Sequence, residues 1–534
     1  MARRLCTHLI LVAFPIVAIA SYSALAADTT DAPLLPSEIT KIIGAPNYAG
    51  ATWGLRVVDL AVAKPLATIG PDALFFTGSV RKLFSAGAAL NALGPDHRFK
   101  TPVYRQGEVR DGVLDGDLVL VASGDLTLGG RDSPDGRIAF TNFDHTESNS
   151  LGSSILAKTD PLAGIGALAQ QVAAAGIKEI AGDVVVDDRL FDHFRVPNGN
   201  VLITPMIVND NLIDVTIVPT EPGKPAKVDW RPKSAAFTVR SELMTAGAGE
   251  EAKIELELSG ADETVGVVKG KIPVDYKPPL PGVPTLVQTF SIQDPSAYAR
   301  TVFIEALQKA AVRVRAKPTG PNPAAQLPAP GSYEAAAKIA ELASQPYSQY
   351  ARLILKVSHN LGANLSLMLF GLTQDARTID TALAAERRTL VAEYGLPEGG
   401  FDFPTNGSGS PDSRASPVAV TQLLEAMQKT KSATQYFETL PGLGVDGSLA
   451  TIGKDPPNAV IAPAFGRVFA KTGTTLDATG LKAQVFAGYI DAKSGKRLAY
   501  VVYVKNVSPI EGIGDIIKVF AEEGEISAYL YERY

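Results

Sequence analysis

Hydrophobic and polar positions near the start of the chain predict a mixture of strands and helices. A short helix is predicted over residues 37–43. Residues 53–60 and 65–69 form two β-prone runs on either side of a turn, which predicts a strand pair. A long apolar run follows residue 82, and its spacing predicts a buried helix from Ser79 to about residue 93.

The pattern changes after residue 98, where short runs bounded by turns replace the helical spacing. The predicted elements are strands at residues 99–104, 107–110, 114–121 and 182–187 and helices at 161–175 and 294–311. Residues 131–154 are polar and rich in Asn, Ser and Asp, which predicts a loop. Residues 211–271 have a β pattern with little helical signal. Proline-rich segments at 277–284 and 318–330 are interpreted as linkers, the second as the return from an inserted region.

Helical spacing dominates from residue 333 until the chain ends in strands and a last helix. Helices are predicted at 333–343, 358–370, 378–394, 416–428 and 514–531, and strands at 465–471, 484–491 and 498–504. The two ends of the chain therefore predict one α+β domain, in which helices flank an antiparallel sheet. A large, mostly β region is inserted into it.

Composition changes this picture little. The chain has 534 residues, of which 46% are hydrophobic and 20% charged, as in ordinary globular proteins of two or three domains. The formal net charge is −6, and no basic stripe indicates nucleic-acid binding. After the first 26 residues, no stretch is apolar enough to span a membrane.

Residues 1–26 have the pattern of a secretory signal peptide. Arg3 and Arg4 precede a largely apolar run over residues 9–20, and Ala24-Leu25-Ala26 forms a cleavage signal. The alternative, an uncleaved anchor, fits the short apolar run less well. The single cysteine, Cys6, lies in this segment, so the mature protein would contain no thiol and no disulfide.

The first candidate for chemistry is the pair Ser79 and Lys82 at the start of a predicted helix. Residues three apart share one helix face, so the lysine lies within reach of the serine hydroxyl. A serine needs a neighbouring base to become a nucleophile, and a lysine kept neutral by burial can be that base. Taken alone, the pair is explained better as the capped, solvated start of a helix, because serine and lysine are common.

Two further motifs complete a set. Ser358-His359-Asn360 lies in a predicted helical stretch, and Lys471-Thr472-Gly473, followed by Thr474, ends a predicted strand. Each alone has a structural interpretation, as a helix cap and as a turn. In this order the three motifs are those of penicillin-recognising acyl-transfer enzymes. Lys471 would bind a substrate carboxylate, and Gly473 would let the strand backbone approach the substrate closely. The N–H groups of Ser79 and Thr474 would form an oxyanion hole.

The chain resembles the class C low-molecular-mass penicillin-binding proteins, the D-alanyl-D-alanine carboxypeptidase/endopeptidase family. Besides the three motifs, the resemblance includes the stretches at residues 182–188, 294–299, 406–409 and 444–449. It implies a transpeptidase-like domain at residues 27–98 and 331–534. It also implies an inserted second domain at 99–210 and 291–330, with a third domain at 211–290 nested inside it.

The resemblance also implies site roles. It makes Ser79 the acylated nucleophile and Lys82 its base. Ser358 and Asn360 form the second catalytic element, Lys471 is the third, and Thr472, Gly473 and Thr474 bind substrate. Members of the family use an acid from the inserted region to meet the amine of the wall peptide, and Asp187 is the best match, with Asp188 beside it. Neither a metal nor an organic cofactor is implied.

The function implied is an exported serine-type D-Ala-D-Ala carboxypeptidase, periplasmic or associated with the cell wall. It would act on peptidoglycan stem peptides and be acylated by β-lactams. The alternatives left open are a peptidoglycan D,D-endopeptidase, a β-lactamase or esterase, and a non-catalytic wall-binding protein. The sequence does not predict the oligomeric state.

The chain departs from the family pattern at a few positions. An arginine usually found after the Asn406 region is missing, because the stretch continues as Ser410-Pro411-Asp412. The loop at 131–154 is longer than usual. His359 is interpreted as a spacer residue between Ser358 and Asn360.

Overall fold

The computed structural model describes residues 35–280, 282–477 and 480–534, and the predicted signal peptide lies outside these ranges. One part of the chain is built on a five-stranded antiparallel sheet in the order β2-β1-β22-β21-β20. Its strands are β1 (Thr52–Asp59), β2 (Lys64–Ile69), β20 (Val468–Asp477), β21 (Gly480–Asp491) and β22 (Arg497–Val507). The two ends of the chain therefore meet in one sheet.

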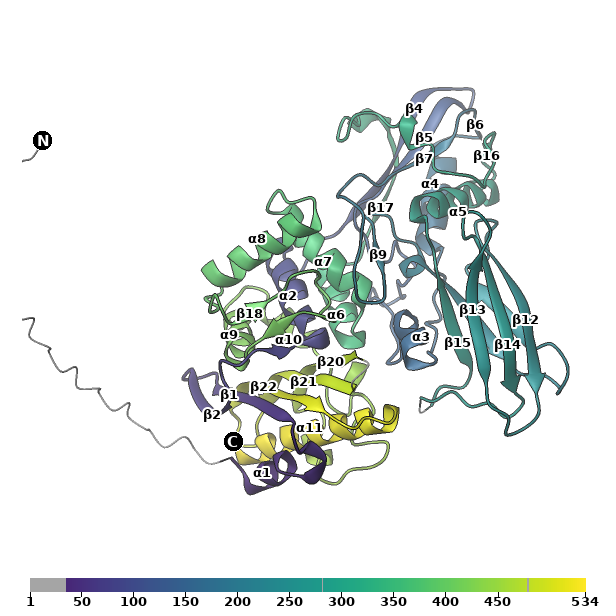
Figure 1. Ribbon diagram of the computed structural model, residues 1–534. Coiled ribbons are helices and arrows are strands. Elements are labelled where there is room, and N and C mark those ends of the chain that lie inside the picture. Colours follow the sequence, from purple (N-terminus) through teal and green to yellow (C-terminus); the bar gives the residue numbers. More distant parts are fainter. Residues whose placement is uncertain (1–34, 281, 478–479) are drawn as a thin grey trace, which may run out of the picture.

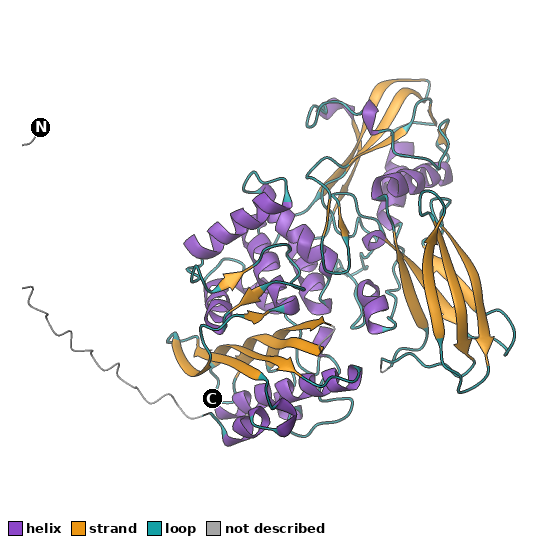
Figure 2. Ribbon diagram, in the orientation of Figure 1, coloured by secondary structure: helices purple, strands orange, loops and turns teal. Residues whose placement is uncertain are grey.

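Helices cover both faces of this sheet (Figures 1 and 2). On one face lie α1 (Ser37–Ile43) and α11 (Ile513–Arg533). On the other lie α2 (Lys82–Leu93), α6 (Tyr347–Val357), α7 (Asn360–Leu372), α8 (Ile379–Ala392), α9 (Pro417–Met427) and α10 (Ala433–Glu438). Strand β22 is apolar almost throughout because both of its faces are covered: Val501 and Tyr503 join one core, and Tyr500 and Val502 the other.

The inserted region contains a second sheet in the order β16-β6-β5-β4-β17. Strand β7 joins this sheet by pairing with β5. Its strands are β4 (Lys100–Arg110), β5 (Val113–Val121), β6 (Glu179–Ile180), β7 (Val184–Asp187), β16 (Arg313–Val314) and β17 (Lys338–Ala343). Helices α4 (Ala163–Ala174) and α5 (Pro295–Lys309) pack on it through a shared apolar core.

The inserted region also contains two three-stranded sheets, at the right of Figure 1. One contains β10 (Leu212–Val218), β11 (Lys227–Arg231) and β15 (Leu286–Ser291), and the other β12 (Thr238–Ala246), β13 (Lys253–Ser259) and β14 (Val265–Pro273). Between β5 and α4, short elements include η3 (His145–Glu147) and α3 (Ser148–Leu151). The remaining short strands are β3 (Phe75–Phe76), β8 (Phe194–Arg195), β9 (Leu202–Ile203), β18 (Phe401–Asp402) and β19 (Arg414–Ala415).

The α+β class is confirmed, but the helix predicted over residues 333–343 is wrong. Residues 338–343 form β17, which pairs antiparallel with β4 and is itself the edge strand of that sheet. The alanine-rich stretch has high helix propensity, and pairing with an exposed sheet edge overrides it. The sheet of the inserted region thus continues beyond residue 331, where the sequence places the return to the first domain. The domain boundaries themselves stay predictions.

Candidate active site

Ser79 and Lys82 lie where the chain leaves a short strand and enters the helical layer. The segment makes one 3-10 turn, η2 (Gly78–Arg81), before α2 begins at Lys82, so the α-helix starts three residues later than predicted. The Lys82 ammonium Nζ donates to Ser79 Oγ at 2.7 Å. Lys82 is fully buried, whereas Ser79 is partly exposed. The serine therefore faces the surface with a buried amine directly behind it.

Three other acceptors surround the Lys82 amine. Its Nζ lies 2.7 Å from Asn360 Oδ1, 3.3 Å from Ser358 Oγ and 3.2 Å from the Ser408 carbonyl oxygen. Burial lowers the pKa of Lys82 to about 7, although the nearby Glu147 opposes this shift. A substantial fraction of Lys82 is therefore neutral near pH 7, as a base requires.

Ser358 and Asn360 belong to a junction between two helices, which corrects the expectation of a continuous helical stretch. Ser358 ends α6 in the left-handed conformation, with φ of 64°, and α7 begins at Asn360. His359 between them is fully buried, and its Nδ1 accepts from the Gly362 N–H at 3.0 Å, which caps α7. Interpreting His359 as a spacer is therefore wrong.

Lys471 reaches the same point from within β20. The expectation that its motif ends a strand is wrong, because β20 continues to Asp477. Its Nζ donates to Ser358 Oγ at 2.9 Å and to the Thr472 carbonyl oxygen at 2.8 Å. Burial and the positive charge of Lys82 hold the pKa of Lys471 well below its usual range. An incoming substrate carboxylate would favour the protonated form of Lys471.

The backbone of β20 lies directly against the segment that carries Ser79. A Cβ atom on Gly473 would lie 2.2 Å from the Thr77 carbonyl oxygen, and one on Gly78, whose φ is +44°, would lie 2.5 Å from the Thr474 nitrogen. Gly473 therefore permits contact with the nucleophile's own segment. The Thr472 hydroxyl donates to Ser448 Oγ at 3.1 Å, and that of Thr474 to Gln484 Oε1 at 2.7 Å.

Asp187 is not part of this cluster. Its carboxylate accepts from Arg189 Nε and Nη2, each at 2.8 Å, and from the Tyr333 hydroxyl at 2.6 Å. Burial raises its pKa, but these bonds outweigh burial and lower it overall. Within the described residues, no hydrogen bond or ion pair joins Asp187 to the three motifs. The substrate-binding role of Asp187 stays a prediction.

Glu147 is a site residue that the sequence did not reveal. It lies at the end of η3, in the segment predicted as a loop, and its Oε1 accepts from Asn360 Nδ2 at 2.8 Å. Burial raises the pKa of Glu147 to about 7, while the charges of Lys82 and Lys471 oppose the shift. No motif marks a lone acid in a polar stretch, so only the unusual length of the loop pointed to this region.

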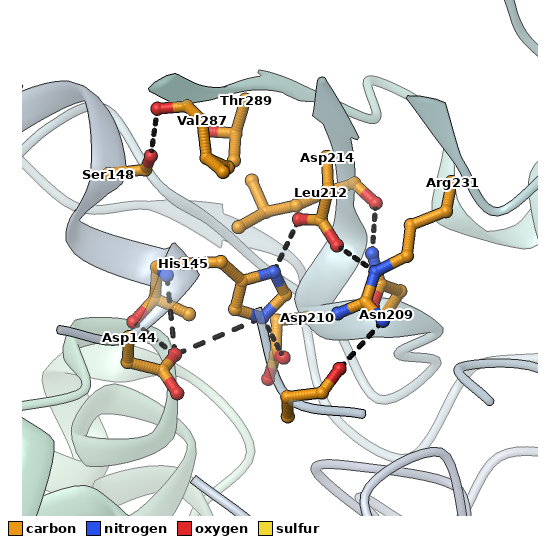
Figure 3. Close-up of polar contacts among 12 residues, drawn as sticks. Asp144, His145, Ser148, Asn209, Asp210, Leu212, Asp214, Arg231, Val287 and Thr289 are labelled. Carbon is orange, nitrogen blue, oxygen red and sulfur yellow. Dashed lines mark hydrogen bonds and ion pairs between the residues drawn. The ribbon is translucent and has the colours of Figure 1, made fainter. Parts of the chain in front are cut away.

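A buried network of charged residues holds the Ser358–Asn360 junction to the inserted region. Asp210 accepts from His359 Nε2 at 2.9 Å, from His145 Nε2 at 2.8 Å and from Arg131 Nη2 at 2.8 Å. Figure 3 shows the His145 ring between Asp210 and Asp214. Arg131 also makes a bidentate pair with Asp144, at 2.7 and 2.9 Å. The network therefore fixes both the junction and the segment before Glu147.

Among the described residues, no group of three or more His, Cys, Asp or Glu side chains could hold a metal ion. No helix in that part of the chain is both long and apolar enough to cross a membrane.

Comparison with known proteins gives a consistent result. The sequence model of the D-Ala-D-Ala carboxypeptidase 3 (S13) family matches residues 35–518. The chain is 26% identical to the D-alanyl-D-alanine carboxypeptidase of Actinomadura sp. (strain R39), over 93% of this chain and 86% of that protein. It is 23% identical to D-alanyl-D-alanine carboxypeptidase DacB of Haemophilus influenzae, over 86% of each chain.

A solved structure shows the same fold. Penicillin-binding protein 4 (dacB) of Haemophilus influenzae superposes with a TM-score of 0.67 at 20% identity, covering 93% of this chain and 98% of that one. A second structure of that protein, in complex with a β-lactam, gives a TM-score of 0.64 at 19% identity, with the same coverage.

Proposed function

The chain belongs to the D-Ala-D-Ala carboxypeptidase 3 (S13) family, and on this premise we propose that it is a serine-type D-Ala-D-Ala carboxypeptidase acting on peptidoglycan stem peptides. The family predicted from the three motifs is thereby confirmed, whereas the activity of this chain is the proposal. One observation carries it: Lys82 Nζ lies 2.7 Å from both Ser79 Oγ and Asn360 Oδ1. That arrangement joins a partly exposed serine to a buried amine of lowered pKa, as nucleophilic catalysis requires.

The first step is acylation. Neutral Lys82 takes the proton of Ser79 while Oγ attacks the carbonyl carbon of the penultimate D-alanine. The N–H groups of Ser79 and Thr474 would stabilise the oxyanion, since β20 packs tightly against the Ser79 segment. Removing one such donor typically costs about 10²–10³ in rate.

The second step releases D-alanine. Ser358 Oγ lies between the two lysine amines, 3.3 Å from Lys82 Nζ and 2.9 Å from Lys471 Nζ. It is therefore placed to pass a proton from Lys82 to the leaving amine. The terminal carboxylate of the substrate would bind Lys471 together with the hydroxyls of Thr472 and Thr474. Asn360 would hold the substrate amide. Water then resolves the acyl-enzyme.

The setting of this activity is also part of the proposal. The signal pattern at residues 1–26 supports export, with a periplasmic or cell-wall-associated enzyme after cleavage. β-Lactams should acylate Ser79 because they mimic the D-alanyl-D-alanine end. The motif chemistry serves a peptidoglycan D,D-endopeptidase equally well, and cleavage of defined wall peptides separates the two activities.

The deciding experiment uses a fluorescent penicillin. We expect purified mature protein to become labelled on the Ser79 peptide, or to turn the penicillin over, and a Ser79→Ala variant to do neither. Mass spectrometry locates the label. If the wild-type protein shows neither label nor turnover, the chain is not an acyl-transfer enzyme, and a wall-binding role takes its place.

A further inference from the structure

Glu147 lies in the active site on a segment whose residues before and after it are both held by hydrogen bonds. Before it, Asp144 and His145 belong to the buried charge network. After it, the Ser148 hydroxyl donates to the Val287 carbonyl oxygen at 2.6 Å, and Asn149 exchanges two hydrogen bonds of 2.9 Å with the Thr289 backbone. Figure 3 shows Ser148 and Val287 in contact above the network. The position of the Glu147 carboxylate is therefore fixed by the fold.

The two oxygens of the Glu147 carboxylate differ in their hydrogen bonds. One oxygen, Oε1, accepts from Asn360 Nδ2, while Asn360 Oδ1 accepts from Lys82. Among the described residues, no donor bonds to the second oxygen, Oε2. The Glu147 side chain is partly exposed, so solvent water can reach this oxygen and complete its bonding. Glu147 therefore has one oxygen tied to the catalytic residues and one available to a water molecule in the site.

Hydrolysis of an acyl-enzyme needs a base for its water. A carboxylate becomes effective in this role when burial brings its pKa close to neutral pH, and glutamate activates the deacylating water in some serine enzymes that share the S-x-x-K motif. The charged groups that face Glu147 are Lys82 from α2, Lys471 from β20 and Asp144 from its own segment. The two lysines favour the ionised form, and burial and Asp144 oppose it.

We propose that Glu147 is the general base of deacylation. The inference rests on the proposed acyl-transfer function. Glu147 Oε2 takes one proton from a water molecule as the water oxygen bonds to the acyl carbon. The bond from that carbon to Ser79 Oγ then breaks. The same proton, passed on through Lys82, returns to Ser79 Oγ, and the product leaves as a carboxylic acid that ionises in solvent. Penicillin bound to Ser79 would then be hydrolysed and released.

The test separates acylation from deacylation. Fluorescent penicillin is mixed with wild-type protein, E147Q and the control D135N, and the bound label is then chased with unlabelled penicillin. Glutamine retains an oxygen that can accept from Asn360, so we expect acylation of E147Q within about threefold of wild type. We expect deacylation to slow by about 10²-fold or more, because general-base catalysis contributes about 10²–10⁴. Asp135 is an exposed acid of the same segment, and D135N should match wild type.

Two further measurements exclude a merely structural role. Wild-type deacylation should slow as pH falls below about 7, where Glu147 becomes protonated, whereas the residual rate of E147Q should not change there. A Glu147→Asp variant keeps a carboxylate and should retain part of the rate and its pH dependence, which keeps the test valid if E147Q folds poorly.

The outcomes are distinguishable. A wild-type protein that labels, together with an unchanged chase rate in E147Q, contradicts the role of Glu147 alone. Equal slowing of acylation and deacylation in E147Q would mean that Glu147 only positions Asn360, and would also overturn the proposal. Absence of both label and turnover in the wild-type protein contradicts the acyl-transfer function itself.

Discussion

Lys82 combines full burial with a position directly behind the nucleophile. Replacing it with methionine keeps the side chain's approximate volume and removes the base. We expect penicillin acylation of Lys82→Met to fall by about 10²–10⁴, the usual contribution of general-base catalysis. Stopped-flow labelling measures the loss, and thermal unfolding should show that the fold is retained. The matched control is Lys64→Met, at an exposed position. Labelling at the wild-type rate would exclude Lys82 as the base.

The acylation rate should also depend on pH through Lys82. The amine must be neutral to accept a proton, and burial lowers its pKa to about 7. The rate should therefore rise as pH increases through about 7 and reach a plateau above it. Labelling rates measured between pH 5.5 and 9 check this in the wild-type protein. A rate that is still rising at pH 9, with no plateau, would mean that Lys82 behaves as an ordinary exposed lysine.

The three motifs could be located in the sequence because acyl transfer requires particular residue types at fixed spacings. Ser79 and Lys82 must share one turn, and a glycine must stand two residues after Lys471, where the strand packs closely. Glu147 has no such signature, since a single acid reaches the site only through contacts made by Ser148 and by the charge network. Tertiary contacts of that kind are absent from local sequence patterns.

At the scale of elements, the junction between α6 and α7 depends on Asp210. This residue has a left-handed backbone, with φ of 55°. Its carboxylate accepts hydrogen bonds from His359, His145 and Arg131. Breaking a buried ion pair on one side typically costs about 3–5 kcal/mol, because the partner charges remain buried. We expect Asp210→Asn to lower the unfolding free energy by about that amount and to slow acylation, because Ser358 and Asn360 lose their support.

Urea unfolding and penicillin labelling test both parts of this prediction. Asp229→Asn is the control, since Asp229 is an exposed acid of strand β11 that forms an ion pair with Lys233. If D210N and D229N unfolded at the same urea concentration, the buried network would contribute nothing to stability.

Helices and strands were predicted well where the local hydrophobic pattern determines them. They were predicted poorly where pairing with a distant strand determines the structure. The apolar spacing after Lys82 and four strands of the five-stranded sheet carry their own signal, and these strands overlap their predicted ranges closely. Strand β20 was predicted poorly, because it extends six residues beyond the predicted end at 471. Helix α6 was missed, although Tyr347, Tyr350 and Ile354 recur at helical spacing. Strand β17 could not be predicted from its residues, because an alanine-rich segment becomes a strand only beside β4.

At the scale of the whole molecule, the inserted region contributes directly to the site. The α+β class could be predicted from the helical and β spacing of apolar residues along the chain. The route by which β10 and β15 support Glu147 did not, because it depends on how separate sheets pack. Asp214 of β10 binds His145, and the backbone of β15 binds Ser148 and Asn149. The sheets of the insertion thus form the frame on which the proposed base is held.

This frame can be loosened without touching any residue of the three motifs. Asn149→Ala removes two hydrogen bonds to the Thr289 backbone, each contributing about 0.5–1.5 kcal/mol net. We expect the Glu147 segment to become less well positioned, so that deacylation slows by about 3–10-fold while acylation is unchanged. The pulse-and-chase labelling used for E147Q measures both rates. Asn47→Ala, an exposed change in the other part of the chain, should alter neither. If N149A slowed acylation as much as deacylation, the insertion would support the whole site, and its effect would not pass through Glu147 in particular.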